Sequence, residues 1–352
     1  MLGIAFGTRP EWIKILPVVK ELIERVIPFK LIITGQHSDL LNYNKISEDL
    51  FDRGYDPADW KKGKRTMRVL EIATLDDANR LDSIVSSILS KSDNILDGCT
   101  SIMVQGDTTS AFACALAAFH RQIPVIHLEA GLRTYVLEQP FPEEGNRQMI
   151  SCIAKLHLCP TYEAEENLYS ERKDWQSLVK TTGNTVLDNI RDVKTTNLKR
   201  VLVTMHRREN HERLDEWFTN INALAKERPD YEFLLPIHPN PNVLKHRDLL
   251  THVKVVEPME HDELIKYLAS CEYVITDSGG IQEEACFLRK PTIVCRKDTE
   301  REEGLGNFSM LCTGPEFLSD IHGRLHKLKC EGPCPYGDGH SVEKVVDAIQ
   351  GL

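Results

Sequence analysis

The chain has 352 residues, of which 41% are hydrophobic and 27% are charged, and its formal net charge is -10. A chain of this length is typical of about two domains with a sizeable core. The negative charge argues against a nucleic-acid backbone or an anionic membrane as the main partner, because both favour basic patches. No apolar run approaches the roughly 18 residues of a spanning helix, and no charged signal region is evident. We therefore expect a cytoplasmic protein.

Ten cysteines are scattered along the chain, several of them within apolar runs. Free cysteine in such places behaves as a small hydrophobic residue, so we interpret these cysteines as reduced and structural. Cys330 and Cys334 form the only close pair. Because a zinc site needs four ligands, we predict no metal site there.

Strand, turn and helix patterns alternate through the first half of the chain. Apolar runs predict strands over residues 2–6, 29–34, 101–105, 123–128 and 156–159. Apolar residues at helical spacing predict helices over residues 10–25, 36–49, 75–90 and 162–172. Residues 51–67 are charged and interrupted by Gly and Pro, so they predict a surface loop. This alternation indicates an α/β fold with a parallel sheet and crossover helices.

A second series of strands and helices begins at Val201. Strands are predicted over residues 201–204, 231–237, 253–258, 273–277 and 291–295. Helices are predicted over 214–226, near Asn242, over 262–269 and from Gly280. We expect an N-terminal domain over 1–175, a second domain over 176–338, and a last segment, 339–352, whose helix packs back onto one of the two, with the N-terminal domain preferred.

Four carboxylates in residues 101–147 follow predicted strands or begin a predicted helix. Asp107 and Glu129 each come directly after an apolar run, and Glu143 and Glu144 stand at a helix start led by proline, with Arg147 one turn later. Ligands of open α/β sheets bind at the carboxyl ends of the strands. Carboxylates gathered at that edge are suited to proton transfer.

The stretch GTRP, residues 7–10, joins a strand to a helix, and the amino end of a helix attracts phosphate. A simple strand-to-helix turn is the alternative, and we favour it for this motif alone because the full glycine fingerprint is missing. No GxGxxG occurs anywhere in the chain. A bound nicotinamide cofactor is therefore not supported.

Cationic groups follow strands of the second half. His206, Arg207 and Arg208 come directly after a predicted strand, and His238 follows another. A solvated basic loop and structural histidines are the alternatives. Adjacent cationic groups at the ligand edge suit a diphosphate on which charge develops as it leaves. Arg301 lies in the acidic stretch DTEREE and needs a partner.

The stretch TDSGGIQEEA contains the strongest phosphate signal. A strand runs into Ser278, Gly279 and Gly280, whose small size lets backbone N–H groups approach a ligand closely. We expect Glu283 and Glu284 in the first turn of the helix that follows. An ordinary helix cap by Asp277 or Ser278 is the alternative, and the paired glycines favour phosphate binding.

Ten motifs between residues 7 and 339 closely resemble the UDP-N-acetylglucosamine 2-epimerase family in sequence and order. They are GTRPEWIK, QGDTTS, HLEAGLRT, PFPEEGNR, TGNTVLD, HRREN, PIHPNPN, TDSGGIQEEA, DTERE and PYGDG. The resemblance implies a glycosyltransferase-B-like pair of Rossmann-like domains, with the nucleotide held mainly by the second and the sugar in the interdomain cleft. It also implies a homodimer, and neither a redox cofactor nor a metal.

The resemblance carries family roles onto matching residues of this chain. The implied acid/base residues are Asp107, Glu129, Glu143 and His206. The implied substrate contacts are Arg9, Lys14, Arg207, His238, Ser278, Gly279, Gly280, Glu284 and Arg301. The implied reaction removes the C2 proton of a UDP-2-acetamido sugar while UDP leaves C1, then adds UDP back to the glycal intermediate. The expected conversion is UDP-GlcNAc to UDP-ManNAc.

Several positions depart from the family pattern. Glu302 follows Arg301 where the family has Pro, and Leu264 stands at the place of an aromatic residue near uracil. Asp39 replaces a usual Gln in the stretch linked to allosteric UDP-sugar binding, and residues 51–67 diverge. These departures affect contacts to the base and regulation by a second UDP-sugar.

Alternative functions remain open from the sequence. Within the class they are a hydrolysing epimerase, which releases ManNAc and UDP, and an epimerase of a 6-deoxy or diacetamido-uronic UDP-sugar. From other classes they are a glycosyltransferase of the same fold and a UDP-sugar-binding module without catalysis. Exchange at C2 separates epimerases from both of these.

Overall fold

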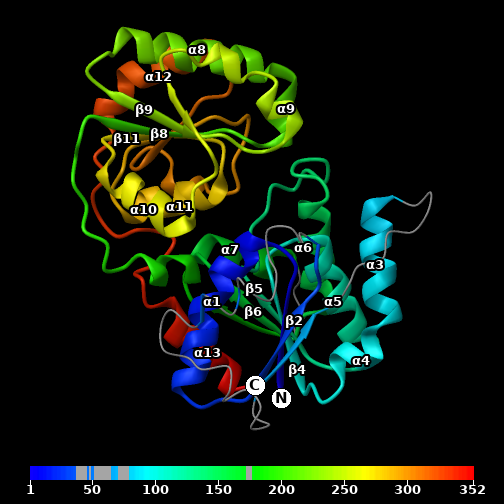
Figure 1. Ribbon diagram of the computed structural model, residues 1–352. Helices are drawn as coiled ribbons and strands as arrows, with labels where there is room; N and C mark the ends of the chain where they lie inside the picture. Colours follow the sequence, from blue (N-terminus) through cyan, green and yellow to red (C-terminus); the bar gives the residue numbers. More distant parts are fainter. Residues whose placement is uncertain (37–45, 47–48, 51–64, 70–78, 172–176) are drawn as a thin grey trace. The chain divides into compact units, whose positions relative to one another are not determined.

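The computed structural model describes residues 1–36, 46, 49–50, 65–69, 79–171 and 177–352 (Figure 1). The described chain forms two compact units. Unit 1 comprises Met1–Asn189 and Gly339–Leu352, and unit 2 comprises Ile190–Asp338. The first unit thus ends after Asn189, whereas the sequence suggested a boundary at 175; the extent of the functional domains stays a prediction. None of the helices in the described ranges has the length and apolar character needed to cross a bilayer.

Unit 1 is built on a seven-stranded sheet in the order β3-β2-β1-β4-β5-β6-β7, and all its strand pairs are parallel. The strands are β1 (Leu2–Phe6), β2 (Phe29–Ile33), β3 (Arg65–Val69), β4 (Ser101–Gln105), β5 (Val125–Leu128), β6 (Leu156–Cys159) and β7 (Leu178–Thr181). The strand order reverses between β1 and β4, which creates the switch point where such sheets bind ligands.

Helices cover both faces of this sheet, with α1 and α13 on one face and α3, α4 and α5 on the other (Figure 1). The helices of unit 1 are α1 (Arg9–Glu24), α3 (Arg80–Ser90), α4 (Ser92–Leu96), α5 (Thr109–Phe119), α6 (Glu143–Ile153), α7 (Tyr162–Glu171), the 3₁₀ helix η2 (Thr185–Asn189) and α13 (Ser341–Gln350). Because both faces are covered, the strand residues of β1 and β2 are buried on both sides, as the continuous apolar runs predict.

The last helix, α13, belongs to unit 1 although it follows unit 2 in the sequence. Its Val345 and Val346 are fully buried in the same hydrophobic core as Phe6 of β1 and Trp12 of α1. The rings of Phe6 and Trp12 stack with their centroids 5.0 Å apart. The backbone N–H of Val342 donates to the Asp188 carboxylate at 3.0 Å, which also ties the start of α13 to η2.

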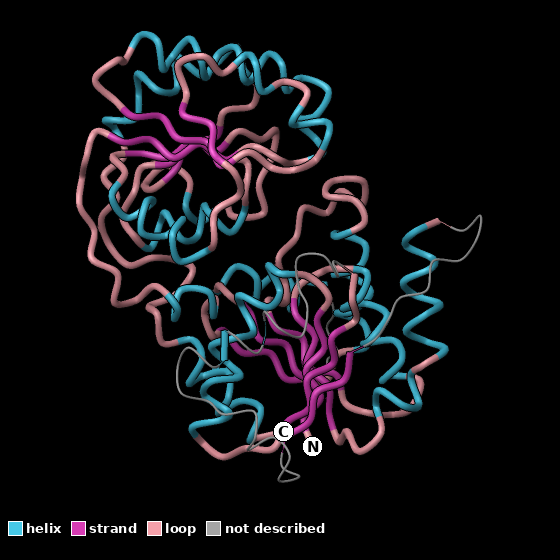
Figure 2. Tube along the Cα trace, viewed as in Figure 1, coloured by secondary structure: helices cyan, strands magenta, loops and turns pink. Residues whose placement is uncertain are grey.

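Unit 2 is built on a six-stranded parallel sheet in the order β10-β9-β8-β11-β12-β13. Figure 2 shows the strands of both units in magenta and the helices in cyan. The strands are β8 (Arg200–Thr204), β9 (Glu232–Pro236), β10 (Lys254–Val256), β11 (Tyr273–Thr276), β12 (Thr292–Val294) and β13 (Ser309–Leu311). Helices α8 and α12 lie on one face, and α10 and α11 on the other (Figure 1). The sheet order reverses between β8 and β11, so the loops after these two strands are neighbours.

The helices of unit 2 are short apart from α8. They are α8 (Leu214–Glu227), α9 (Pro241–Leu244), α10 (His261–Ser270), α11 (Gly279–Phe287) and α12 (Leu318–Arg324), with 3₁₀ helices η3 (Arg208–Arg213), η4 (Arg247–Leu249), η5 (Glu302–Gly304), η6 (Pro315–Phe317) and η7 (Leu325–Lys327).

The predicted α/β class with parallel sheets is confirmed, and the errors lie at the sheet edges. Residues 65–67 were predicted to be loop, but they belong to β3, which pairs with β2 over its whole length. The sequence also gave no prediction for β7 and β13. All three are edge strands, which lack the continuous apolar run of a central strand. Residues 51–64 and most of the predicted helix 36–49, including Asp39, lie outside the described residues.

Candidate active site

Glu129 marks the point where β5 ends in unit 1. Its backbone has a φ of +63°, in the left-handed region that non-glycine residues rarely occupy. Its side chain is only 6% exposed. Such a conformation persists only where the surroundings hold it, and it is common at functional sites. Two residues later, Gly131 has a φ of +86°, and a Cβ there would lie 2.0 Å from the Ala164 carbonyl oxygen. Both the positive φ and the close packing against Ala164 therefore require glycine at position 131.

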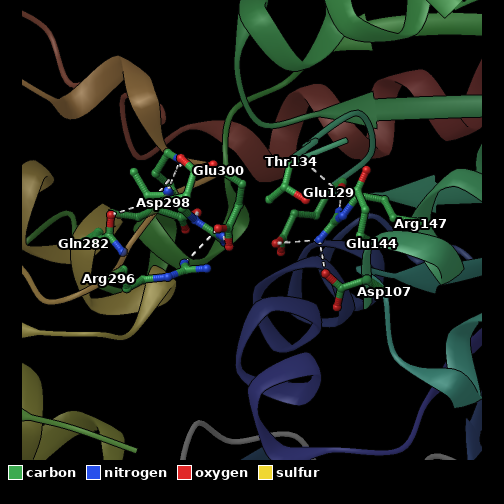
Figure 3. A network of polar contacts seen from close by, with 12 residues as sticks. Asp107, Glu129, Thr134, Glu144, Arg147, Gln282, Arg296, Asp298 and Glu300 are labelled. Atoms are coloured by element: carbon green, nitrogen blue, oxygen red, sulfur yellow. Dashed lines mark hydrogen bonds and ion pairs between the residues drawn. The ribbon is translucent and has the colours of Figure 1, made fainter. Parts of the chain in front are cut away.

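Two cations and an amide surround the Glu129 carboxylate. Lys14 Nζ of α1 forms an ion pair with its Oε2, and Gln105 Nε2, at the end of β4, donates to the same oxygen. Arg147 of α6 donates to the Glu129 carbonyl oxygen, and its Nη2 lies 3.8 Å from Glu129 Oε1 (Figure 3). Four elements that are distant in the sequence therefore meet at this carboxylate.

Arg147 also connects Glu129 to Asp107. Its Nη2 forms an ion pair with Asp107 Oδ2, and its side chain is 4% exposed (Figure 3). Asn146 holds the backbone of the same turn, because its Nδ2 donates to the Asp107 carbonyl oxygen at 2.9 Å. The Asp107 side chain remains 28% exposed. One carboxylate of the pair is thus open to a ligand, and the other is nearly enclosed.

Glu143 and Glu144 occupy different environments at the start of α6. Glu143 is the first residue of the helix and is half-buried. Glu144 is buried and accepts hydrogen bonds from the backbone N–H groups of Thr134 at 3.0 Å and Tyr135 at 3.2 Å (Figure 3). Glu144 therefore fixes the loop that follows Gly131, a role that the sequence did not reveal.

A small polar pocket adjoins Glu129. It is lined by Gln105, Leu128, Glu129, Pro160, Gly183, Asn184 and Thr185. Gly183, Asn184 and Thr185 belong to the stretch TGNTVLD, to which the sequence assigned no chemistry. Thr185 Oγ1 donates to the Lys14 carbonyl oxygen at 2.6 Å, so this stretch is tied to the helix that carries Lys14. The stretch TGNTVLD therefore lies beside the Glu129 carboxylate.

The contacts of the GTRP stretch favour a simple strand-to-helix turn. The buried carboxylate of Glu11 accepts from the backbone N–H groups of Gly7 at 3.0 Å and Thr8 at 2.7 Å. Thr8 and Glu11 form a capping box at the start of α1, and burial raises the pKa of Glu11. A Cβ at Gly7 would lie 2.2 Å from Thr34 Oγ1, so packing explains this glycine. Arg9, the first residue of α1, is half-buried.

Asp277 organises the loop after β8 in unit 2. Its fully buried carboxylate accepts from the backbone N–H groups of His206 at 2.9 Å and Arg207 at 2.8 Å, and from Asn210 Nδ2 at 3.0 Å. We considered Asp277 or Ser278 as a cap of the following helix, but Asp277 holds this neighbouring loop and Ser278 makes no side-chain cap. The adjacency of β8 and β11 explains the contact.

His206 lies in the loop that Asp277 holds. Its Nδ1 is 3.6 Å from Asp277 Oδ1, and its ring stacks on His238 with centroids 5.5 Å apart. Although 35% of its side chain is open to solvent, the surrounding protein desolvates the ring and lowers the pKa of His206, an effect that outweighs the Asp277 charge. His206 is therefore predominantly neutral at pH 7. The adjacent Arg207 has a buried Nε that makes no hydrogen bond within the described protein.

The helix α11 begins directly after Ser278 and has no side-chain cap. Its backbone N–H groups are suited to an anion, because the first turn of a helix has no internal acceptors. Arg301 packs against Gly279, where a Cβ would lie 2.7 Å from the guanidinium carbon, whereas a Cβ at Gly280 would meet no heavy atom within 4 Å. Packing against Arg301 therefore explains the glycine at position 279, whereas no contact within the described residues explains the glycine at position 280.

A buried ion-pair network fixes Arg301 in place. Its Nε donates to Glu283 Oε1 at 2.9 Å, and its Nη1 pairs with Glu300. Glu300 also accepts from Arg296 Nη1 at 2.8 Å, and Arg296 Nε pairs with Glu209 at 2.8 Å (Figure 3). Burial alone raises the pKa of Glu300, but the neighbouring arginines outweigh burial and hold it below its usual range. Arg301, for which the sequence indicated that a partner is needed, therefore has two carboxylate partners, Glu283 and Glu300.

The two glutamates of α11 were misplaced by one turn. The helix begins at Gly279, so Glu283 and Glu284 lie in its second turn and not in the first. Glu283 pairs with Arg301, and Glu284 Oε1 lies 2.6 Å from His261 Nε2 of α10. Cys334 lies beside Cys286, and among the described residues no three His, Cys, Asp or Glu side chains are grouped as metal ligands.

The described geometry yields two groups of candidate residues. Unit 1 brings together Asp107 and Glu129 through Arg147, and Lys14 pairs with Glu129. Unit 2 brings together His206, Arg207 and His238 in the loops after β8 and β9, and it places Arg301 against Gly279. The sequence missed Gln105, Arg296 and Glu300 and gave Asp277 only a capping role. Sheet topology was the missing signal for Asp277.

Comparison with known proteins identifies the family. A family model described as UDP-N-acetylglucosamine 2-epimerase matches residues 20–350. UDP-N-acetylglucosamine 2-epimerases from Salmonella borreze and Bacillus subtilis are 35% and 34% identical to the chain. These alignments cover 99% and 98% of this chain and 97% and 93% of the two relatives.

Solved structures agree with the sequence comparison. The UDP-GlcNAc 2-epimerase from Neisseria meningitidis bound to UDP-GlcNAc has a TM-score of 0.86 and 32% identity, and the match covers 100% of both chains. A glycosyltransferase of kitacinnamycin, with a TM-score of 0.60 and 11% identity, shares the fold alone, which confirms the glycosyltransferase-B-like prediction. With a family model over nearly the whole chain and full-length relatives above 30% identity, the chain belongs to the UDP-N-acetylglucosamine 2-epimerase family of isomerases.

Proposed function

We propose that this protein interconverts UDP-GlcNAc and UDP-ManNAc by elimination and re-addition of UDP. The observation that carries the proposal is the joining of Asp107 and Glu129 through Arg147, with Lys14 paired to Glu129, in a chain of this family. The Neisseria relative is bound to UDP-GlcNAc. The Methanocaldococcus jannaschii epimerase is in complex with UDP-GlcNAc and UDP. It is 26% identical to this chain with a TM-score of 0.80, and the match covers 100% of this chain and 99% of that one.

Unit 2 is the proposed binding unit for UDP. The uncapped start of α11 offers the backbone N–H groups after Ser278 to a phosphate, and the buried Nε of Arg207 offers a further donor. Arg301 keeps this helix start in shape, because it is packed against Gly279 and held by Glu283 and Glu300. His238 and Glu284 are further proposed substrate contacts, as is Arg9 of unit 1.

The proposed reaction begins with removal of the C2 proton by a carboxylate. The electrons of the C–H bond form a C1–C2 double bond, and the C1–O bond to UDP breaks, which leaves a glycal and UDP. UDP then adds back to C1 while an acid returns a proton to the opposite face of C2. Asp107, Glu129 and Glu143 are the proposed proton-transfer groups, since two faces of one ring require two groups.

His206 has a separate proposed role at the leaving group. Because burial lowers its pKa, the ring is neutral before UDP binds, and its N–H can donate a hydrogen bond to UDP. Asp277 fixes the backbone from which the ring projects, since it accepts from the N–H groups of His206 and Arg207. A donor held in position stabilises charge that develops on the departing β-phosphate.

Incubating the protein with UDP-GlcNAc in D₂O tests the proposal. We expect deuterium at C2 of both the recovered substrate and UDP-ManNAc, detected by NMR, because the proton lost to the protein exchanges before it returns. Free ManNAc with UDP would indicate the hydrolysing reaction. Exchange only with a 6-deoxy or diacetamido-uronic UDP-sugar would assign a different substrate, and transfer without C2 exchange would indicate a glycosyltransferase. The homodimer implied by the family remains a proposal.

The paired glycines of α11 offer a test of the proposed UDP site. Gly279→Ala forces a methyl group into the Arg301 guanidinium, and we expect a loss of about 1–3 kcal/mol in the free energy of unfolding. Gly280→Ala meets no protein atom within 4 Å, so stability is expected to stay the same or rise by up to about 1 kcal/mol, since alanine favours a helix.

Calorimetry with UDP separates the two variants. Gly280→Ala is expected to weaken UDP binding despite unchanged stability, because its methyl group lies where the phosphate approaches the backbone. Unchanged UDP affinity in Gly280→Ala would remove this helix start from the proposed site. Equal thermal stability of Gly279→Ala and the parent protein would show that Arg301 moves aside at no cost.

A further inference from the structure

Two cysteines of unit 2 are in contact outside the proposed site. Cys286 lies near the carboxyl end of α11 and is 2% exposed, whereas Cys334 is half-buried in the segment between η7 and α13. Their Sγ atoms are 3.6 Å apart, about the distance of a van der Waals contact. The residues are separated by 48 positions in the sequence. Tertiary structure alone therefore places the two thiols together.

The segment that carries Cys334 is linked to the Arg301 loop. Tyr336, two residues after Cys334, is buried, and its hydroxyl donates to the Arg301 carbonyl oxygen at 2.9 Å. The same hydroxyl accepts from the backbone N–H of Gly304 at 3.1 Å. Cys286 lies on the helix whose amino end carries Gly279. A covalent bond between the two sulfurs would join α11 directly to the segment whose Tyr336 contacts the Arg301 carbonyl oxygen.

We propose that Cys286 and Cys334 are a redox-active pair that closes to a reversible intramolecular disulfide when the protein meets a peroxide. A disulfide requires the sulfurs to approach from 3.6 Å to about 2.05 Å. The approach needs movement of one segment, and Cys334 lies in irregular structure where Gly332 has a φ of +84° and Gly337 a φ of +137°. The helix that carries Cys286 can stay in place.

The chemistry is a two-electron oxidation with hydrogen peroxide as oxidant. The Cys334 thiolate attacks one peroxide oxygen, so an S–O bond forms, the O–O bond breaks and hydroxide leaves to become water. The Cys286 sulfur then attacks the Cys334 sulfenic acid, so the S–S bond forms and a second water leaves. Two thiols and one peroxide thus give one disulfide and two waters.

Cys334 is the thiol that ionises first. A hydrogen bond with Cys286 lowers the pKa of Cys334, an effect larger than the opposing effect of burial. Cys334 is also the more exposed of the two residues. The thiolate is the reactive form of cysteine, so peroxide reacts first with Cys334, the more accessible sulfur. Cys286, which is in contact with Cys334, is the resolving thiol.

The test uses the full-length protein treated with hydrogen peroxide and then quenched. Peptide mass spectrometry without reductant is expected to show the Cys286 and Cys334 peptides joined with a loss of two hydrogens. The oxidised protein is expected to unfold at a temperature higher by roughly 5 °C or more, because the bond closes a long loop. Dithiothreitol reverses both changes.

Three variants make the assignment specific. Cys286→Ser and Cys334→Ser are each expected to abolish the cross-link and the thermal shift, while Cys152→Ser, which removes an exposed thiol of unit 1, leaves both unchanged. A bond between Cys330 and Cys334, irreversible sulfinic acid at Cys334, or no cross-link when Cys152 is fully oxidised would each overturn the proposal. These measurements need no UDP-sugar, so they are independent of the proposed function.

Discussion

Replacing Glu129 by glutamine is expected to lower kcat about 100- to 10,000-fold, the range typical of losing a general acid or base. Glutamine keeps the shape of the side chain but cannot take up a proton. Its amide oxygen can still accept from Lys14 and Gln105, so the contacts around residue 129 largely persist. The measurement is the rate of deuterium incorporation at C2 of UDP-GlcNAc, with Asp107→Asn as a parallel variant.

A matched control separates catalysis from general effects of charge removal. Asp93, in the same unit, pairs with Arg121 and is 94% exposed, so Asp93→Asn is expected to leave kcat unchanged. Circular dichroism and thermal unfolding check that each variant folds. If Glu129→Gln and Asp107→Asn changed only the affinity for the UDP-sugar, the protein would be a binding module.

Replacing Glu300 by glutamine is expected to lower the free energy of unfolding of unit 2 by about 3–5 kcal/mol. Glu300, which is 9% exposed, lies between Arg296 and Arg301, and its removal leaves two buried guanidinium groups without their shared anion. Each arginine keeps one other partner, Glu209 and Glu283 respectively, so we expect destabilisation and not complete unfolding. Thermal unfolding followed by calorimetry measures the difference.

The pH dependence of this difference has a definite sign. The arginines hold the folded pKa of Glu300 below the ordinary glutamate value of 4.5. The stability that Glu300 contributes is therefore fully present well above pH 4.5 and is lost as the pH falls through the lower, folded pKa. The difference in the free energy of unfolding between the parent protein and Glu300→Gln is therefore expected to become smaller in acid.

The control for this prediction lies on the same loop. Glu302 is exposed and two residues away, and Glu302→Gln is expected to change stability by no more than about 0.5 kcal/mol at any pH. A difference in the free energy of unfolding between the parent protein and Glu300→Gln that stayed constant from pH 7 to strongly acidic solution would contradict the role assigned to the Glu300 charge.

Buried strands were the part of the fold that the sequence predicted well. Strands such as β1 and β11 are covered on both faces, and this leaves a continuous apolar run in the sequence. The edge strand β7 is largely exposed, and it carries no such run. Its pairing with β6 is a tertiary contact that no local pattern encodes.

The candidate site was predicted residue by residue, but its internal connections were not. The sequence placed Asp107 and Glu129 at strand ends, yet the cation that joins them, Arg147, was seen only as a residue near a helix start. For Asp277 the sequence offered only a helix cap, and only as an alternative, because its contacts with the His206 loop span about 70 positions. Such links depend on strand order, which apolar periodicity does not determine.

The position of α13 has a consequence for how the protein is made on the ribosome. The core of unit 1 needs Val345 and Val346, which are translated only after the whole of unit 2. The part of this core that α13 covers beside α1 therefore stays open while unit 2 is synthesised. Unit 2, which is continuous in sequence, can complete its core earlier. Unit 1 begins synthesis first and completes its folding last.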